Sequence, residues 1–230
     1  MAKGMIGERW RWVVVAFLLG CLLIGLVREA VADTSTAEES APQQTPILAD
    51  GPALSTDRSL TGIDALSGTF EQTIRDPKGE LVATSQGEFA ILKPHFLRWF
   101  VRAPGQQLLV SDGEYLWQHD LDLETLVRQP IDRGQNSPLR LLIEPEASLT
   151  SDYSISRDAQ TIRLTPLTDS SLFQVVTLFF DGEHIRAMQL LDNLGQTIDV
   201  VLSLNPETML TPGDFQFEVP EGMDIIIREP

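Results

Sequence analysis

The chain has 230 residues, of which 43% are apolar, and a formal net charge of −16 at pH 7. This length suits one domain of roughly 150–200 residues with additional segments, and the apolar content is sufficient for a hydrophobic core. Because a strongly acidic surface repels phosphate groups, nucleic acid and anionic membrane surfaces are not expected partners.

The first 32 residues have the pattern of a secretory signal peptide. A basic start with Lys3, Arg9 and Arg11 precedes an apolar run over 12–27, and Ala30-Val31-Ala32 follows as a small-residue cleavage pattern. The apolar run is shorter than the roughly 20 residues of a spanning helix, which favours a cleaved signal over an anchor. We therefore expect a secreted protein with a signal peptide at 1–32.

The only cysteine, Cys21, lies inside this apolar run. The string Leu18-Leu19-Gly20-Cys21 is also similar to a lipidation site, which would make Cys21 the mature N-terminus. In that case 22–27 would remain as an exposed apolar tail, so we favour Cys21 as an apolar residue of the signal. The mature chain then has no thiol and no disulfide.

A flexible leader is expected at 33–53, which is rich in Ser, Thr, Ala, Gln and Pro without apolar periodicity. The folded domain is expected over 54–230. It begins with loose helical spacing over 54–66, which predicts a short amphipathic helix weakened by Gly62.

Beyond this helix the pattern predicts β-strands, because short runs of branched, aromatic and Leu residues alternate with turn signals. Asp112-Gly113 and Asp181-Gly182 each separate two apolar runs, which indicates tight hairpins. About a dozen strands in succession predict an antiparallel meander that curls into a barrel or half-barrel. The expected strands are 68–75, 84–92, 96–102, 107–111, 115–120, 125–130, 153–156, 161–166, 173–180, 185–191, 197–205 and 215–219.

One segment inside the meander predicts a helix instead. Residues 137–143 begin with Ser and Pro and carry Leu on nearly every side. A helix that is apolar all round must be buried or must cover an apolar opening. The pattern alone leaves two architectures open, a sandwich with a filled core and a curled sheet around an apolar cavity.

No set of catalytic or metal-binding residues stands out in the sequence. Gly-x-Ser-x-Gly, phosphate-binding glycine loops and His-Glu-x-x-His are absent, and the three histidines lie far apart in the chain. The acidic stretch 119–124 lacks the glycine and spacing of a calcium loop, so we expect a solvated turn there. We expect no enzyme activity, no cofactor and no metal.

The region from Gly68 to about Ile226 resembles the LolA family of periplasmic lipoprotein carriers. The resemblance depends on the order and spacing of several strings, each of which is weak alone. They are GTFEQ at 68–72, QGEF at 86–89, LKPHFLRW at 92–99, LVSDGEYLW at 109–117, SPL at 137–139 and FQFEVPEGMD at 215–224.

The resemblance implies a mainly β fold, an incomplete antiparallel β-barrel with short helices as a lid over an apolar cavity. It implies that the cavity binds the acyl chains of lipoproteins and that no bond is made or broken in the carrier. The cavity residues would be Phe70, Phe89, Leu97, Trp99, Leu109 and Trp117, and the lid residues Leu139, Leu142 and Ile143.

Lys93 stands where the family has an arginine that holds the lid, and lysine lacks the planar five-donor fork of arginine. The resemblance also implies a periplasmic monomer that receives outer-membrane lipoproteins from the inner-membrane ABC transporter LolCDE and passes them to the receptor LolB. A LolB-like acceptor, a related lipid sensor and a lipid-ester hydrolase remain alternative interpretations.

Overall fold

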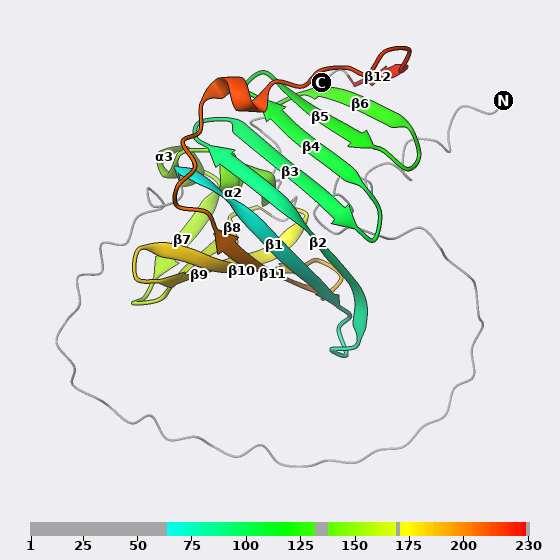
Figure 1. The fold of residues 1–230 in the computed structure, drawn as a ribbon. Coiled ribbons are helices and arrows are strands. Elements are labelled where there is room, and N and C mark those ends of the chain that lie inside the picture. The colour runs from blue at the N-terminus through cyan, green and yellow to red at the C-terminus, as the bar shows by residue number, and fades with distance from the viewer. Residues whose placement is uncertain (1–63, 132–137, 169–170, 229–230) are drawn as a thin grey trace, which may run out of the picture.

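The computed structural model describes residues 64–131, 138–168 and 171–228. Within these ranges twelve strands form a single sheet, and short helices lie between and after them (Figure 1). The strands are β1 Ala65–Arg75, β2 Leu81–Leu92, β3 Phe96–Ala103, β4 Gln107–Asp112, β5 Tyr115–Asp120, β6 Thr125–Pro130, β7 Tyr153–Arg157, β8 Thr161–Pro166, β9 Phe173–Asp181, β10 His184–Asp192, β11 Thr197–Leu204 and β12 Ile225–Ile227. The helices are α2 Pro138–Ile143, α3 Glu146–Leu149 and the 3-10 helix η2 Pro212–Phe215.

The strand order is β12-β6-β5-β4-β3-β2-β1-β11-β10-β9-β8-β7. Two antiparallel meanders, β1–β6 and β7–β11, therefore join where β1 pairs with β11, from Gly68 opposite Leu204 to Arg75 opposite Thr197. The edge strands β12 and β7 are not neighbours in this order, so the sheet is open. The fold is the predicted incomplete antiparallel barrel, but it is built from two meanders, because the chain crosses through α2 and α3 before it starts β7.

The tight turns form where the sequence predicts them. Gly113 has φ +99° and Gly182 has φ +58°, a region that glycine enters without steric cost. The carboxylate of Asp112 accepts hydrogen bonds from the backbone N–H groups of Glu114 and Tyr115, at 2.9 and 2.7 Å. These contacts set the β4–β5 register that positions several residues discussed below.

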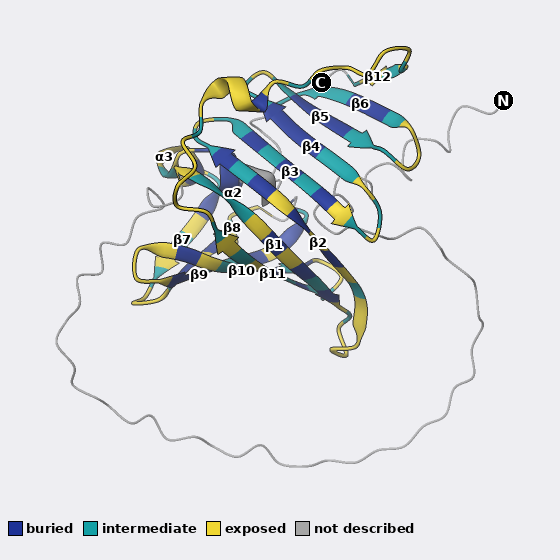
Figure 2. Ribbon diagram, viewed as in Figure 1, coloured by how far each residue is buried: buried dark blue, intermediate teal, exposed yellow. Residues whose placement is uncertain are grey.

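The core lies on the inner face of the curled sheet. One continuous cluster of buried apolar residues takes members from β1–β5, β7–β11, α2 and α3 (Figure 2). Members from both meanders contact one another because the sheet bends over on itself (Figure 1). An ion pair between Arg157 of β7 and Glu146 of α3 joins the helical crossing to the edge strand.

One predicted strand is wrong. A strand was expected at 215–219, but the chain there follows η2 and carries no strand, and the last strand is β12, which pairs in parallel with β6. Leu66, expected at the end of a helix, belongs to β1, where hydrogen bonding to β2 outweighs its loose helical spacing. Most of that expected helix, the signal peptide and the leader lie outside the described residues.

A second, smaller cluster lies on the outer face of β4–β6. It contains Val110, Trp117 and Leu126, with Phe217, Met223 and Ile225 of the C-terminal segment packed against it. The C-terminal segment thus covers this part of the sheet (Figure 1). In the described part of the chain, no helix has both the length and the apolar character needed to cross a membrane.

Candidate functional site

Three neighbouring strands place aromatic side chains together on the inner face. Trp99 of β3 stacks on Phe70 of β1 with ring centroids 4.1 Å apart, and Phe89 of β2 lies 5.7 Å from the same indole ring. Phe89, Trp99 and Leu109 are direct cross-strand partners, so their side chains share one face. With Leu97, five of the six predicted cavity residues are buried in one cluster.

A glycine makes the close packing of these rings possible. Gly87 of β2 pairs with Phe70, and a Cβ atom built at this position would lie 2.8 Å from the ring of Phe70 and 1.9 Å from the carbonyl oxygen of Phe100. Any side chain at position 87 would therefore displace the ring or the neighbouring strand. This explains in physical terms why the QGEF string carries a glycine.

The short helix α2 packs against this aromatic face. Leu142 and Ile143, two of the three predicted lid residues, are buried in the same cluster, and Leu141 joins them. The side chain of Leu139 lies outside the described residues. The helix therefore fills the space in front of the aromatic residues in this structure.

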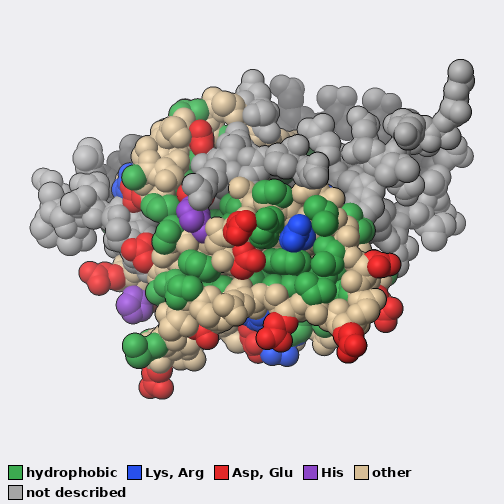
Figure 3. Space-filling model, turned by 90° about the horizontal axis from the view of Figure 1, so that it is seen from above, with side chains coloured by type: hydrophobic (Ala, Val, Ile, Leu, Met, Phe, Trp, Pro, Cys, Tyr) green, Lys and Arg blue, Asp and Glu red, His purple; other side chains and the backbone are tan. Residues whose placement is uncertain are grey.

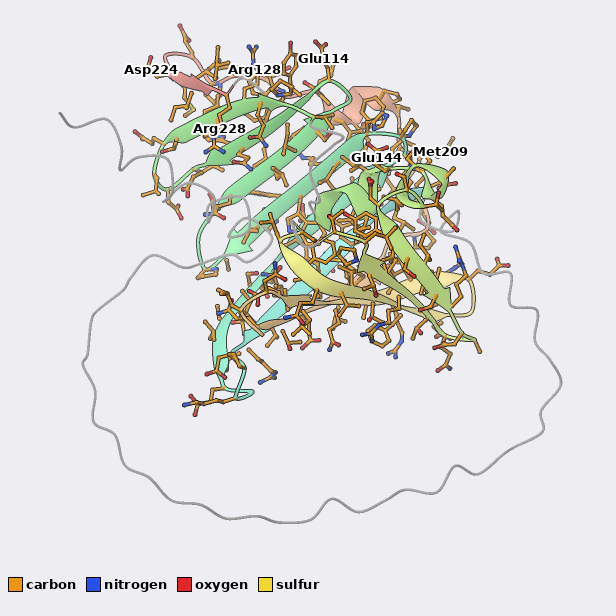
Figure 4. The ribbon with its side chains drawn as sticks, turned by 180° about the vertical axis from the view of Figure 1, so that it is seen from behind. Glu114, Arg128, Glu144, Met209, Asp224 and Arg228 are labelled. Atoms are coloured by element: carbon orange, nitrogen blue, oxygen red, sulfur yellow. The ribbon has the colours of Figure 1, made fainter. Side chains whose placement is uncertain are left out.

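Trp117 does not join the other five predicted cavity residues. It lies on the outer face, where its ring stacks on Phe217 at 5.0 Å and its indole N–H donates to the Asp112 carboxylate at 2.7 Å. Arg128 lies over the same ring, 5.6 Å from its centroid, and is well separated from Glu144 at the end of α2 (Figure 4). Leu116, which precedes Trp117 on β5, faces the inner cluster instead.

The predicted latch, Lys93, lies in the turn between β2 and β3. Its ammonium group is buried and has no hydrogen-bond partner among the described residues. Burial lowers the pKa of Lys93 to about 8, and the carboxylates of Asp64, Glu146 and Glu144 offset only part of this effect.

The contacts from this turn to α2 come from His95, a residue that the sequence did not single out. Its backbone N–H donates to the carbonyl oxygen of Ile143 at 2.8 Å, and its Nδ1 lies 3.2 Å from Oε1 of Glu144. Glu144 is itself buried, with 3% of its surface exposed. The only sequence signal for this contact is its position two residues after Lys93.

Two buried polar groups lie among these apolar residues. The indole N–H of Trp99 and both amide atoms of Gln118 have no hydrogen-bond partner among the described residues. The other predicted cavity residues on this face are aromatic or aliphatic, and the buried polar residues Gln72, Ser85 and Ser111 lie on the same strands. In the described part of the chain no group of His, Cys, Asp and Glu could hold a metal. Such a surface can bind hydrocarbon.

The fold and the site together define an open antiparallel sheet with an aromatic inner face that short helices cover. The family model described as "Outer membrane lipoprotein carrier protein LolA" matches residues 61–218. A protein from Xanthomonas axonopodis pv. citri, named outer-membrane lipoprotein carrier protein, is 34% identical over 74% of this chain and 85% of its own length. One of the same name from Chromohalobacter salexigens is 31% identical over 73% and 82%.

Among solved structures, a LolA superfamily protein from Nitrosomonas europaea matches with a TM-score of 0.44 and 14% identity, over 70% of this chain and 94% of that one. The sequence comparisons alone establish the family: this chain belongs to the LolA family of outer-membrane lipoprotein carriers.

Proposed function

We propose that this protein is a carrier that binds the acyl chains of lipoproteins and moves them from the inner to the outer membrane. The observation that carries the proposal is the family match over 61–218, which includes the whole aromatic inner face. The relatives named as lipoprotein carriers support the same function.

The acyl chains would bind between the aromatic face and α2. Phe70, Phe89 and Trp99 would form one wall, with Leu97 and Leu109 beside them on the same face. Because α2 now occupies this space, it must move outward to admit cargo, so α2 acts as the lid.

The energetics suit a carrier that must also release its cargo. Exposing an acyl chain to water costs about 0.8 kcal/mol per methylene group, so the carrier must bury most of the chain. When the site is empty, Leu142 and Ile143 bury the same apolar surface. Cargo therefore competes with the lid, which lowers its net affinity and allows transfer to an acceptor.

The lid is held at one end by His95 in this proposal, with Lys93 as a charge beside it. The backbone bond from His95 to Ile143 fixes the end of α2, and Glu144 follows directly. Lys93 would act through its charge near Glu144 and Glu146, because its ammonium group donates no hydrogen bond within the described residues.

The cellular setting follows from the family. A signal peptide at 1–32 would direct the chain to the periplasm, where it would act as a monomer. LolCDE in the inner membrane would supply the lipoprotein and LolB in the outer membrane would accept it.

The test uses spheroplasts that retain newly made lipoproteins in the inner membrane. Added purified protein should release lipoproteins as soluble one-to-one complexes. Leu142→Asp and Trp99→Asp should abolish release, because each places a charge in the acyl site. Leu123→Asp is the matched control, since Leu123 is 74% exposed, and it should release lipoproteins as the wild type does.

Urea unfolding shows whether each variant is folded. Trp99→Ala, which removes contacts without adding a charge, provides a further variant if the Asp variants do not fold, and it should reduce release. A folded wild-type protein that releases no lipoprotein would contradict the proposed function.

A further inference from the structure

The inner face holds polar atoms that the fold itself does not use. Gln118 is 3% exposed and Trp99 is 2% exposed. The amide oxygen and nitrogen of Gln118 and the indole Nε1 of Trp99 are all buried without a hydrogen-bond partner in the part of the chain that the structure describes. Leaving such groups unpaired in an apolar site is costly, so their presence requires an explanation.

These groups lie on the same face of the sheet. Trp99 is the cross-strand partner of Leu109, and Leu109 is the partner of Gln118. Direct partners in antiparallel strands place their side chains on one face, and neighbouring strands are about 4.8 Å apart. The backbones of Trp99 and Gln118 are therefore about 10 Å apart, with the leucine between them.

Polar side chains on β4, the strand between β3 and β5, do have partners within the fold. The hydroxyl of Ser111 donates to the carbonyl oxygen of His95, and the amide of Gln107 donates to the Asp120 carboxylate at 3.0 Å. Gln118 and Trp99 thus differ from the polar side chains of β4, and only the hydroxyl of Ser85 on β2 resembles them among the described uncharged residues of β1–β5. An apolar residue at position 118 would suit the free protein better, which indicates that the amide serves a ligand.

The chemistry of these groups defines what they can bind. The indole N–H and the amide N–H₂ donate hydrogen bonds, the amide oxygen accepts one, and neither side chain carries a charge. They suit neutral carbonyl and amide groups set among hydrocarbon. The acyl chains of a lipoprotein are attached through ester and amide groups of this kind, at the head of the hydrocarbon.

We propose that Gln118 and Trp99 bind the ester and amide groups at the head of the acyl chains, with Trp99 donating to a carbonyl oxygen and Gln118 pairing with a second carbonyl or an amide. This inference rests on the proposed function. It adds a means of recognising the ester and amide bonds through which the acyl chains are attached to the lipoprotein. The site then distinguishes a lipoprotein anchor from plain hydrocarbon of equal length.

The experiment compares two synthetic lipopeptides with the same peptide and the same chain lengths. In one the acyl chains are joined by esters, and in the other by ethers, which lack the carbonyl oxygen. Displacement of a fluorescent fatty-acyl probe gives the dissociation constant of each. The wild type should bind the ester form about 3- to 10-fold more tightly, as expected for one or two net hydrogen bonds.

The variants Gln118→Leu and Trp99→Phe should each reduce this ester preference towards one. Gln107→Leu is the matched control on the neighbouring strand and should keep the wild-type preference, because the amide of Gln107 is bonded to Asp120. Urea unfolding should find Gln118→Leu at least as stable as the wild type. A purely structural role for Gln118 would make that variant less stable and leave the preference unchanged.

The outcomes separate this inference from the proposed function. A wild type that binds both lipopeptides equally, or prefers the ether, overturns the inference and leaves the carrier function standing. Retention of the preference in Gln118→Leu and Trp99→Phe also overturns it. A wild type that binds neither lipopeptide contradicts the carrier function itself.

Discussion

Lys93 is a lysine whose charge is poorly compensated, and this has a consequence for stability. Burial lowers its pKa to about 8, whereas in the unfolded chain lysine has its ordinary pKa of 10.5. Between these two values the unfolded chain binds more protons than the folded protein, so stability rises as the pH rises through this window. At neutral pH the buried charge lowers stability.

The first prediction concerns Lys93→Met, which removes this charge and keeps an unbranched apolar side chain. The variant should be more stable than the wild type at pH 7, and the difference should shrink as the pH approaches 10.5. At about 1.4 kcal/mol per pKa unit, the full effect is roughly 3 kcal/mol. Urea unfolding from pH 7 to 10 measures it, with Lys78→Met at an exposed turn as the control. Parallel pH curves for the wild type and Lys93→Met would contradict the prediction.

Residue positions explain which parts of the site the sequence could predict. The aromatic strings place Phe70, Phe89 and Trp99 on one face, because alternation along each strand is visible in the sequence. Trp117 was misplaced because strand identity alone does not say which face of β5 turns inward. The Asp112-Gly113 turn contains that information, since a two-residue turn opposes Leu109 to Gln118 and so places Trp117 outside.

At the scale of elements, we expect the C-terminal segment to contribute to stability and not to binding, because it packs on the outer face. Phe217 stacks on Trp117 and lies edge-on to His119, 6.1 Å between centroids, all on the outer face. Phe217→Ala should lower the free energy of unfolding by about 1–3 kcal/mol, less than a fully buried phenylalanine. Affinity for a fatty-acyl probe should stay at the wild-type value, whereas Trp99→Ala should reduce it. A loss of probe affinity in Phe217→Ala would place Trp117 in the acyl site after all.

The strand β12 also protects an edge of the sheet. It pairs with Leu126, Val127 and Arg128 of β6, which would otherwise present unpaired backbone groups. Removal of residues 221–230 should therefore promote self-association through β6. Light scattering coupled to size exclusion should detect dimers or larger species, and a truncated chain that remains monomeric at high concentration would argue against edge protection. The sequence did not predict this strand, because three isoleucines near the end carry no signal for a parallel partner that lies almost 100 residues earlier.

The helices show a different limit of sequence reasoning. The mid-chain helix was predicted from its proline and its all-round leucines, and α2 confirms it. The sequence does not show what α2 contacts, because its contact comes from a distant part of the chain. The hydrogen bond from His95 to Ile143 joins segments about 50 residues apart. The resemblance to the family predicts that Lys93 contacts the lid, and only the folded chain shows that His95 contacts α2.

At the scale of the whole molecule, one face shows an apolar region with acidic side chains within it and along its lower edge (Figure 3). With a net charge of −16, repulsion between these groups opposes the compact state, and salt screens it. The midpoint of thermal unfolding should therefore rise as NaCl increases from 10 to about 150 mM, where the Debye length falls from about 30 to 8 Å. Calorimetry measures the midpoint, and a midpoint that falls with salt would mean that net attraction dominates.

The fold class could be predicted because periodicity, turn chemistry and the order of the family strings all agreed. The pairing of β1 with β11 could not be predicted from local pattern, because Gly68 and Leu204 are far apart in the chain and both strands have the ordinary pattern of a meander strand.

We expect that same pairing to govern how the chain reaches its native state. In the proposed export, strand β1 can pair with β2 as soon as both have crossed the membrane, but β11 follows more than 100 residues later. Until then the apolar inner face of the first meander stays exposed to water. Pairing between strands so far apart in the chain is also slow. We expect folding to be limited by this last docking step, and a newly exported chain to depend on other chaperones before it can serve as one.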